Sequence, residues 1–232
     1  MKRIVLIFAA LMTAMAGYAQ GEDWIALTKF YDRLNRDIYF SGENAVRYEN
    51  IEGTPYLTDE FRKGLLYLKS GEVFSGDYRL DLYANQIEFR KEDGIYVIGT
   101  RDSIAKLDFE DNTIMYVRYE EDITTKQAFF ILIEGGYYSA FIQKNILFRN
   151  ATPARPYQDA PLPARFEQGT DLFYLAEKDN IAVKIGSKKE AITFFGDHGD
   201  IAKQFIDKEK INVKKPFDLA RLIRHMNEVA EK

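Results

Sequence analysis

Apolar and polar residues alternate most regularly in the central third of the chain. Tyr78, Leu80 and Leu82 alternate with polar neighbours, and Ile87 and Phe89 repeat the alternation after a short turn. A period of two residues places successive side chains on opposite faces of a β-strand. The pattern therefore predicts an antiparallel meander with one face toward solvent and one face buried.

Similar apolar runs, separated by turn residues, recur at about ten-residue intervals on both sides of this stretch. The predicted strands cover residues 64–68, 72–74, 78–83, 86–90, 95–98, 104–109, 113–119, 128–133, 137–142, 146–148, 172–175 and 181–185. Their spacing predicts a mainly β (α+β) fold in which an antiparallel meander forms a curled sheet or a partial barrel.

The C-terminal part of the chain has a helical pattern. Three short amphipathic helices are expected, with Ser187 and Asp200 as N-caps of the first two and Pro216 in the first turn of the third. Leu219, Leu222, Ile223 and Met226 form an apolar stripe at three- and four-residue spacing. Helices this short are marginal alone, so they should pack on the sheet. The expected docking surface is the apolar face of residues 78–82 and 87–89.

The division of the chain follows from these patterns. Residues 1–19 have a charged start, an apolar run and small residues before Gln20, and this predicts a secretory signal peptide. Residues 20–185 form the β-rich domain. It begins with a helix from residue 23 whose end at residues 37–40 could already be extended, and it includes a proline-rich loop at 150–168. Residues 186–232 form a helical cap that belongs to the same domain.

Composition narrows the possible partners. The chain has 32 basic and 36 acidic residues, and removal of the predicted signal peptide takes away two of the basic ones. A modestly acidic protein is a poor match for nucleic acid. The chain contains no cysteine, which excludes disulfides and Cys-containing metal sites. No transmembrane segment is expected after signal cleavage, because the apolar N-terminal run is short.

One local cluster has residue types that can ligate a metal. Asp197, His198 and Asp200 lie within four residues and could hold a divalent ion. The same residue types are typical of an interhelix turn, in which Asp200 caps the next helix. We interpret the cluster as a turn and expect neither a metal nor another cofactor. Catalytic signatures such as the nucleophile elbow and the phosphate-binding loop are absent from the sequence.

Several stretches together suggest a family: residues 63–77, the strand pair at 78–89, the helix start at 187–190 and the final 217–223. Their order resembles uncharacterised secreted proteins of unknown function that are common in Bacteroidetes. The resemblance covers most of the mature chain and implies no activity. Proteins of that group are often O-glycosylated at Asp-Ser or Asp-Thr before a small or aliphatic residue. The resemblance therefore makes Ser103, in Asp102-Ser103-Ile104, a candidate glycosylation site.

Two functional hypotheses remain open. The first is a non-catalytic exported protein of the cell envelope (periplasmic, outer-membrane-associated or extracellular) that binds an envelope protein or a small ligand. The alternative is a glycosidase-like hydrolase that uses Asp and Glu side chains from different strands. Convergent buried carboxylates beside an open cleft would favour the hydrolase. An apolar concavity or a flat tyrosine-rich face would favour binding.

Overall fold

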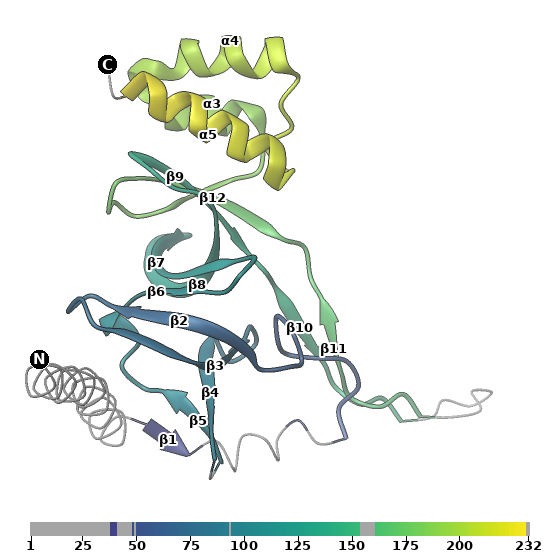
Figure 1. Cartoon of the computed structure of the whole chain (residues 1–232). Coiled ribbons are helices and arrows are strands. Elements are labelled where there is room, and N and C mark those ends of the chain that lie inside the picture. The colour runs from purple at the N-terminus through teal and green to yellow at the C-terminus, as the bar shows by residue number, and fades with distance from the viewer. Residues whose placement is uncertain (1–37, 41–47, 49, 93, 154–160, 231–232) are drawn as a thin grey trace, which may run out of the picture.

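The computed structural model describes residues 38–40, 48, 50–92, 94–153 and 161–230 (Figure 1). In this part of the chain, an eleven-stranded sheet is accompanied by a two-stranded sheet. The predicted signal peptide and most of the predicted N-terminal helix lie outside the described residues. Residues 38–40, at the end of the predicted N-terminal helix, form the strand β1 (Ile38–Phe40), which pairs with β5 (Gly94–Ile98).

The large sheet consists of two antiparallel meanders that meet where β2 pairs with β6. The first meander is β2 (Arg62–Leu68), β3 (Val73–Asp81), β4 (Gln86–Lys91) and β5. After η1 (Arg101–Ser103), the second is β6 (Ile104–Asp108), β7 (Thr113–Glu121), β8 (Thr124–Glu134) and β9 (Tyr138–Gln143). The sheet continues from β9 through β12 (Leu172–Glu177) to β13 (Val183–Ile185). This arrangement confirms the predicted mainly β, antiparallel fold.

Two predicted strands are in fact one. Residues 72–74 and 78–83 are predicted to be separate strands, but the nine-residue strand β3 continues through Ser75, Gly76 and Asp77. The reason is the packing of Tyr78. A Cβ on Gly76 would lie 3.0 Å from the Tyr78 ring, and the Tyr78 hydroxyl donates to the carbonyl of Phe74 at 3.2 Å. Gly76 therefore gives this ring room to lie along its own strand.

The proline-rich stretch also contains more regular structure than expected. β10 (Ile146–Arg149) pairs with β11 (Arg165–Gln168), although residues 150–168 were predicted to be an irregular loop. β11 begins two residues after the last proline of the stretch, so every residue of the strand has an amide available for pairing. The described part of the loop before it, including Thr152, lies outside the named strands.

The helical cap lies at one end of the sheet, beyond β9 and β12, while β1 to β5 lie at the other end (Figure 1). It contains α3 (Lys188–Phe194), η2 (Gly196–His198), α4 (Gly199–Glu209) and α5 (Pro216–Ala230). The oxygen of Ser187 accepts from the amide of Glu190 at 3.2 Å, which confirms the first cap. The prediction that Asp200 is the second N-cap is wrong, because α4 begins at Gly199 and Asp200 already lies in its first turn.

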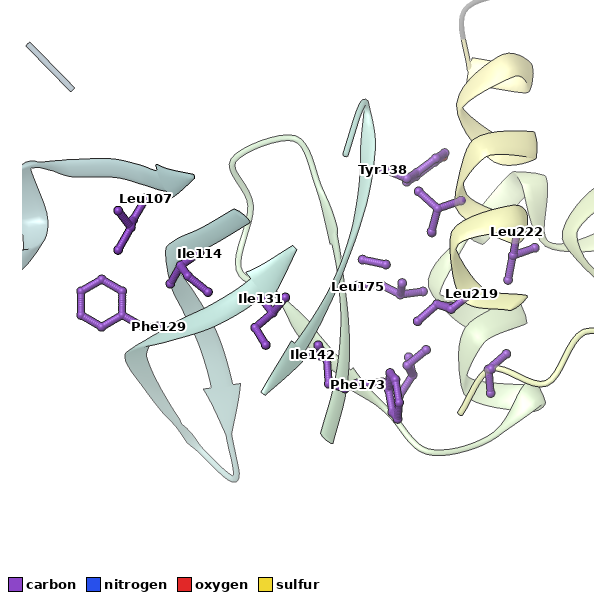
Figure 2. Close-up of a cluster of buried hydrophobic side chains, with 14 of the residues drawn as sticks. Leu107, Ile114, Phe129, Ile131, Tyr138, Ile142, Phe173, Leu175, Leu219 and Leu222 are labelled. Carbon is purple, nitrogen blue, oxygen red and sulfur yellow. The ribbon is translucent and has the colours of Figure 1, made fainter. Parts of the chain in front are cut away.

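The stripe on α5 is buried as expected, but on a different surface. Leu219, Leu222, Ile223 and Met226 are each 0% exposed. Helix α5 contacts β8 and β9, and not the predicted face of β3 and β4. Figure 2 shows Leu219 of α5 beside Leu175 of β12. The curled sheet itself covers the β3–β4 face, because Leu80 and Ile87 belong to one continuous core with the strand residues beneath α5.

The second meander curls far enough to enclose a smaller core on its other face. Phe130, Tyr174 and Tyr119 meet there, with ring centroids 4.7 to 5.4 Å apart. The segment before β13 returns to β7, where the amide of Ala182 donates to the carbonyl of Arg118 at 2.9 Å and the carbonyl of Ala182 accepts from the amide of Glu120 at 3.1 Å. This contact is an isolated bridge rather than a ladder, so the sheet is curled but not closed into a barrel.

Membrane-spanning helices require a long apolar stretch. None of the helices in the described ranges has the length and apolar character to cross a bilayer.

Candidate binding cleft and buried carboxylates

The candidate metal ligands lie in the turn between α3 and α4. Asp197 and His198 belong to η2, and Asp200 is in the first turn of α4. Asp197 and Asp200 are exposed, whereas His198 is half-buried with its Nδ1 3.2 Å from the Tyr138 hydroxyl. Among the described residues, no three His, Asp or Glu side chains are grouped as a metal site would require.

The candidate glycosylation site is at the start of β6. Ser103 is the last residue of η1 and is half-buried, and its hydroxyl donates to the carbonyl of Thr100 at 2.6 Å. The neighbouring residue Asp102 is exposed. Of the Asp-Ser-Ile motif, only Asp102 is fully exposed, since Ile104 is buried, and glycosylation of Ser103 stays a prediction.

Two carboxylates are almost completely buried behind the first meander. Asp81 on β3 is 0% exposed and Glu88 on β4 is 2% exposed. The strand register pairs Arg79 with Glu88 and Asp81 with Gln86, so these polar side chains share one face. The apolar residues that alternate with them face the main core. The alternation in the sequence places these side chains on the face away from that core.

Each buried carboxylate has specific partners. Glu88 accepts from the Arg79 guanidinium at 2.7 and 3.2 Å. Asp81 accepts from the hydroxyl of Tyr48 and from the amide of Ala84, both at 2.8 Å. Tyr56 covers the Arg79 guanidinium, whose carbon lies 3.6 Å from the centroid of its ring. We call Tyr48, Tyr56, Arg79, Asp81 and Glu88 the buried clasp, because their contacts hold Tyr48 and Tyr56 against the sheet.

Burial controls the acid–base properties of the clasp. Removal from water raises the pKa of the Asp81 carboxyl, although its hydrogen bonds partly offset the effect. Burial also raises the pKa of Glu88, against the opposing effect of Arg79. The pKa of Tyr56 rises to about 12 for the same reason. Asp81 borders a hollow of about 200 Å³, but with no exposed surface it cannot meet a substrate there.

A larger cleft lies where β6 and β7 separate. It has a volume of about 470 Å³ and is lined by residues 104–105 of β6 and 115–118 of β7, with further residues from the loop after β12. β6 pairs with β7 only through Leu107–Ile114 and Asp108–Thr113. If this register continued, Ala105 would pair with Tyr116. The two strands instead diverge, and we call the opening between them the β6–β7 cleft.

The β7 wall of this cleft presents backbone groups that pair with no strand among the described residues. The amide of Phe129, opposite Tyr116 in the register of β7 and β8, donates to the side-chain oxygen of Asn85 rather than to β7. At this pair the backbone groups therefore point away from the partner strand, and those of Tyr116 face the cleft. No described strand pairs with Tyr116 on that side. The next contact along this edge is the bridge to Ala182.

The side chains of the cleft combine an apolar floor with a basic rim. The floor contains Ile104, Ala105, Met115, Val117, Phe141 and Ala176. The rim contains the exposed cations Lys69, Arg118 and Lys178 and one exposed carboxylate, Asp179. Such a lining suits a ligand with an apolar part and a negative charge.

The three cations keep much of their charge available. Lys69 forms no ion pair with any described residue. Arg118 donates to the backbone carbonyl of Asp179 at 3.1 Å, and Lys178 lies over the ring of Tyr137, 4.7 Å from its centroid. Neither contact neutralises a positive charge, so the rim stays basic on a chain whose net charge is −4.

Sequence reasoning did not identify the cleft. Its residues come from six separate stretches of the chain, and its position depends on where the β6–β7 pairing stops. Neither alternation nor turn residues encode that point.

Comparisons of the chain with protein-family models, curated proteins and solved structures found no match.

Proposed function

We propose that the protein is a non-catalytic binding protein whose ligand occupies the β6–β7 cleft. The observation that carries the proposal is the contrast in access between the two candidate sites. The cleft of about 470 Å³ has exposed cations at its rim, whereas the buried carboxylates Asp81 and Glu88 have 0% and 2% exposure. A ligand can enter the first site without any movement of the chain.

The chemistry of the lining indicates an amphipathic anion. Apolar side chains at the floor, such as Met115 and Val117, favour an apolar group by removing its surface from water. Lys69 and Lys178 at the rim favour a carboxylate or another anionic group. Neither a nucleophile with its general base nor a pair of exposed carboxylates lines the cleft within the described residues, and this supports binding over hydrolysis.

We also propose that the protein is exported to the cell envelope and belongs with the secreted Bacteroidetes proteins that its sequence resembles. The predicted signal peptide at residues 1–19 supports export. A periplasmic, outer-membrane-associated or extracellular location would place the cleft within reach of an envelope protein or a small envelope ligand.

Titration with anilinonaphthalene sulfonate, an amphipathic fluorescent anion, tests the proposed function. The folded protein should enhance its fluorescence at one site. The double variant Lys69→Glu/Lys178→Glu should weaken binding by about tenfold or more, because two attractions become repulsions. The matched control is Lys203→Glu/Lys208→Glu, which makes the same charge change at exposed lysines of α4 outside the cleft.

Equal binding by the wild type and both double variants would contradict the proposal, as would the absence of binding. The hydrolase alternative has its own test, with nitrophenyl glycosides as substrates. Turnover by the purified protein that disappears in both Asp81→Asn and Glu88→Gln would replace the binding proposal with the hydrolase. We expect no turnover in the wild type.

A further inference from the structure

The β6–β7 cleft has a feature that a pocket for a small molecule does not need, namely a strand edge along one wall that no described strand pairs with. The carbonyl of Arg118 already accepts from the amide of Ala182, and the amide of Glu120 donates to the carbonyl of Ala182, as in strand pairing. Two residues before Arg118 in β7, Tyr116 has no described strand beside it. Unpaired strand edges pair readily with an added extended segment.

On this basis we infer that the natural ligand is an extended acidic peptide segment of a partner protein, which adds as a short strand to the edge of β7 at Tyr116. This inference rests on the proposed function and names its ligand class. The backbone of the segment would pair with the amide and carbonyl of Tyr116. The available edge is short, because Ile114 pairs with β6 on one side and Ala182 occupies the other.

The two faces of β7 define the side chains that such a segment should carry. Met115 and Val117 lie on one face of the strand, with Phe141 and Ala176 also lining the cleft floor. Arg118 lies on the opposite face of β7, because side chains alternate along a strand. An added strand would therefore place apolar residues toward the floor and alternate them with acidic residues on the side of Arg118.

Charge complementarity favours this occupant over a second copy of the chain. The rim has three cations and one carboxylate, whereas the whole chain has a net charge of −4. Like charges on two copies would oppose dimer formation over most of the surface. A short acidic segment instead brings negative charge to the basic rim alone.

The test uses a fluorescein-labelled peptide of four Glu-Val repeats and the full-length mature protein, with fluorescence anisotropy as the measurement. A peptide of four Lys-Val repeats is the charge control and should bind about tenfold more weakly or not at all. Two further Glu-Val peptides carry N-methyl groups on the backbone, one on every Glu and the other on every Val. Alternate amides of a strand point to opposite edges, so each peptide is blocked along one edge only.

One of the two N-methylated peptides should bind about tenfold more weakly than the parent peptide, because paired amides along that edge are lost. The other should bind nearly as well as the parent peptide. The charge-reversal variant Lys69→Glu/Lys178→Glu should weaken the parent peptide, while Lys203→Glu/Lys208→Glu should not. This set of results would establish both strand pairing and the acidic preference.

Other results separate the inference from the proposed function. If both N-methylated peptides bind as well as the parent, or if no Glu-Val peptide binds while anilinonaphthalene sulfonate does, the inference is overturned and the proposed function stands. If the protein sediments as a dimer that excludes the peptide, the occupant is a second copy and the inference is again overturned. Failure of both the peptide and the dye would overturn both proposals.

Discussion

The buried clasp behind the first meander and the β6–β7 cleft in the second use similar residue types in opposite ways. In the clasp, Arg79, Asp81 and Glu88 all have partners and are sealed behind Tyr48 and Tyr56. In the cleft, cations are exposed and a strand edge has no described partner. Charged residues that satisfy one another contribute to structure, whereas accessible groups without a complete set of partners can bind something else.

The comparison predicts that the largest loss of stability follows from breaking the clasp. Arg79→Ala would leave the buried Glu88 carboxylate without its ion-pair partner, which should cost about 3–5 kcal/mol. The matched control is Arg224→Ala, which breaks a pair of similar length, 2.7 Å, whose arginine is 63% exposed. That change should cost about 0–1 kcal/mol. Urea denaturation measures both, and equal effects would show that the clasp is not sealed from water.

A substitution in the buried stripe of α5 should cause the next largest loss of stability. Leu222→Ala should destabilise the protein by about 2–5 kcal/mol, because it leaves a cavity between α5 and the sheet. Phe217→Ala on the same helix, at a side chain 75% exposed, should change stability by less than about 0.5 kcal/mol. Thermal or urea unfolding distinguishes the two. A small effect of Leu222→Ala would mean that the helical cap is not part of the same cooperative unit.

The clasp should also respond to pH. Burial raises the folded-state pKa of Asp81 above its usual value of 3.8, so the folded protein holds this proton more tightly than the unfolded chain. The charged carboxylate therefore lowers stability at neutral pH, and this loss disappears as the pH falls through the raised folded pKa toward the unfolded value.

Asp81→Asn should remove this dependence. The stability of the wild type relative to Asp81→Asn should increase as the pH is lowered from about 7 to about 4. Urea denaturation of both proteins across this range measures the difference. A difference that stays constant, or that changes with the opposite sign, would contradict the assignment of a raised pKa to Asp81.

Changes in the cleft should have the smallest effect on stability. Lys69→Glu and Lys178→Glu alter exposed side chains, so each should change the free energy of unfolding by less than about 0.5 kcal/mol. Their effect should appear in ligand binding instead. A large loss of stability in either variant would remove the distinction between the cleft and the clasp.

The sequence predicted the fold well where local patterns decide it. Alternation located nearly all the strands, and Asn85, with a φ of 52°, confirms the expected turn between β3 and β4. The stripe on α5 correctly predicted burial. Its docking partner was wrong because curling of the sheet, which brings Asn85 to the amide of Phe129, joins residues far apart in the chain.

The candidate site could not be predicted in the same way. The alternation around Tyr78 did place Arg79 and Asp81 on the face away from the main core, but it gave no sign that Tyr48 and Tyr56 would cover them. The cleft depends on the end of the β6–β7 ladder at Leu107 and Ile114. Both features are decided by long-range pairing, which a single sequence does not specify.

Amide hydrogen exchange of β7, followed by NMR, tests the central claim that its edge at Tyr116 is the binding surface. In the free protein, the Tyr116 amide should exchange faster than that of Val117, which faces β8. Addition of the Glu-Val peptide should slow exchange at Tyr116 and leave Val117 unchanged. Equal protection of the two amides in the free protein, or no change at Tyr116 when the peptide is bound, would contradict the claim.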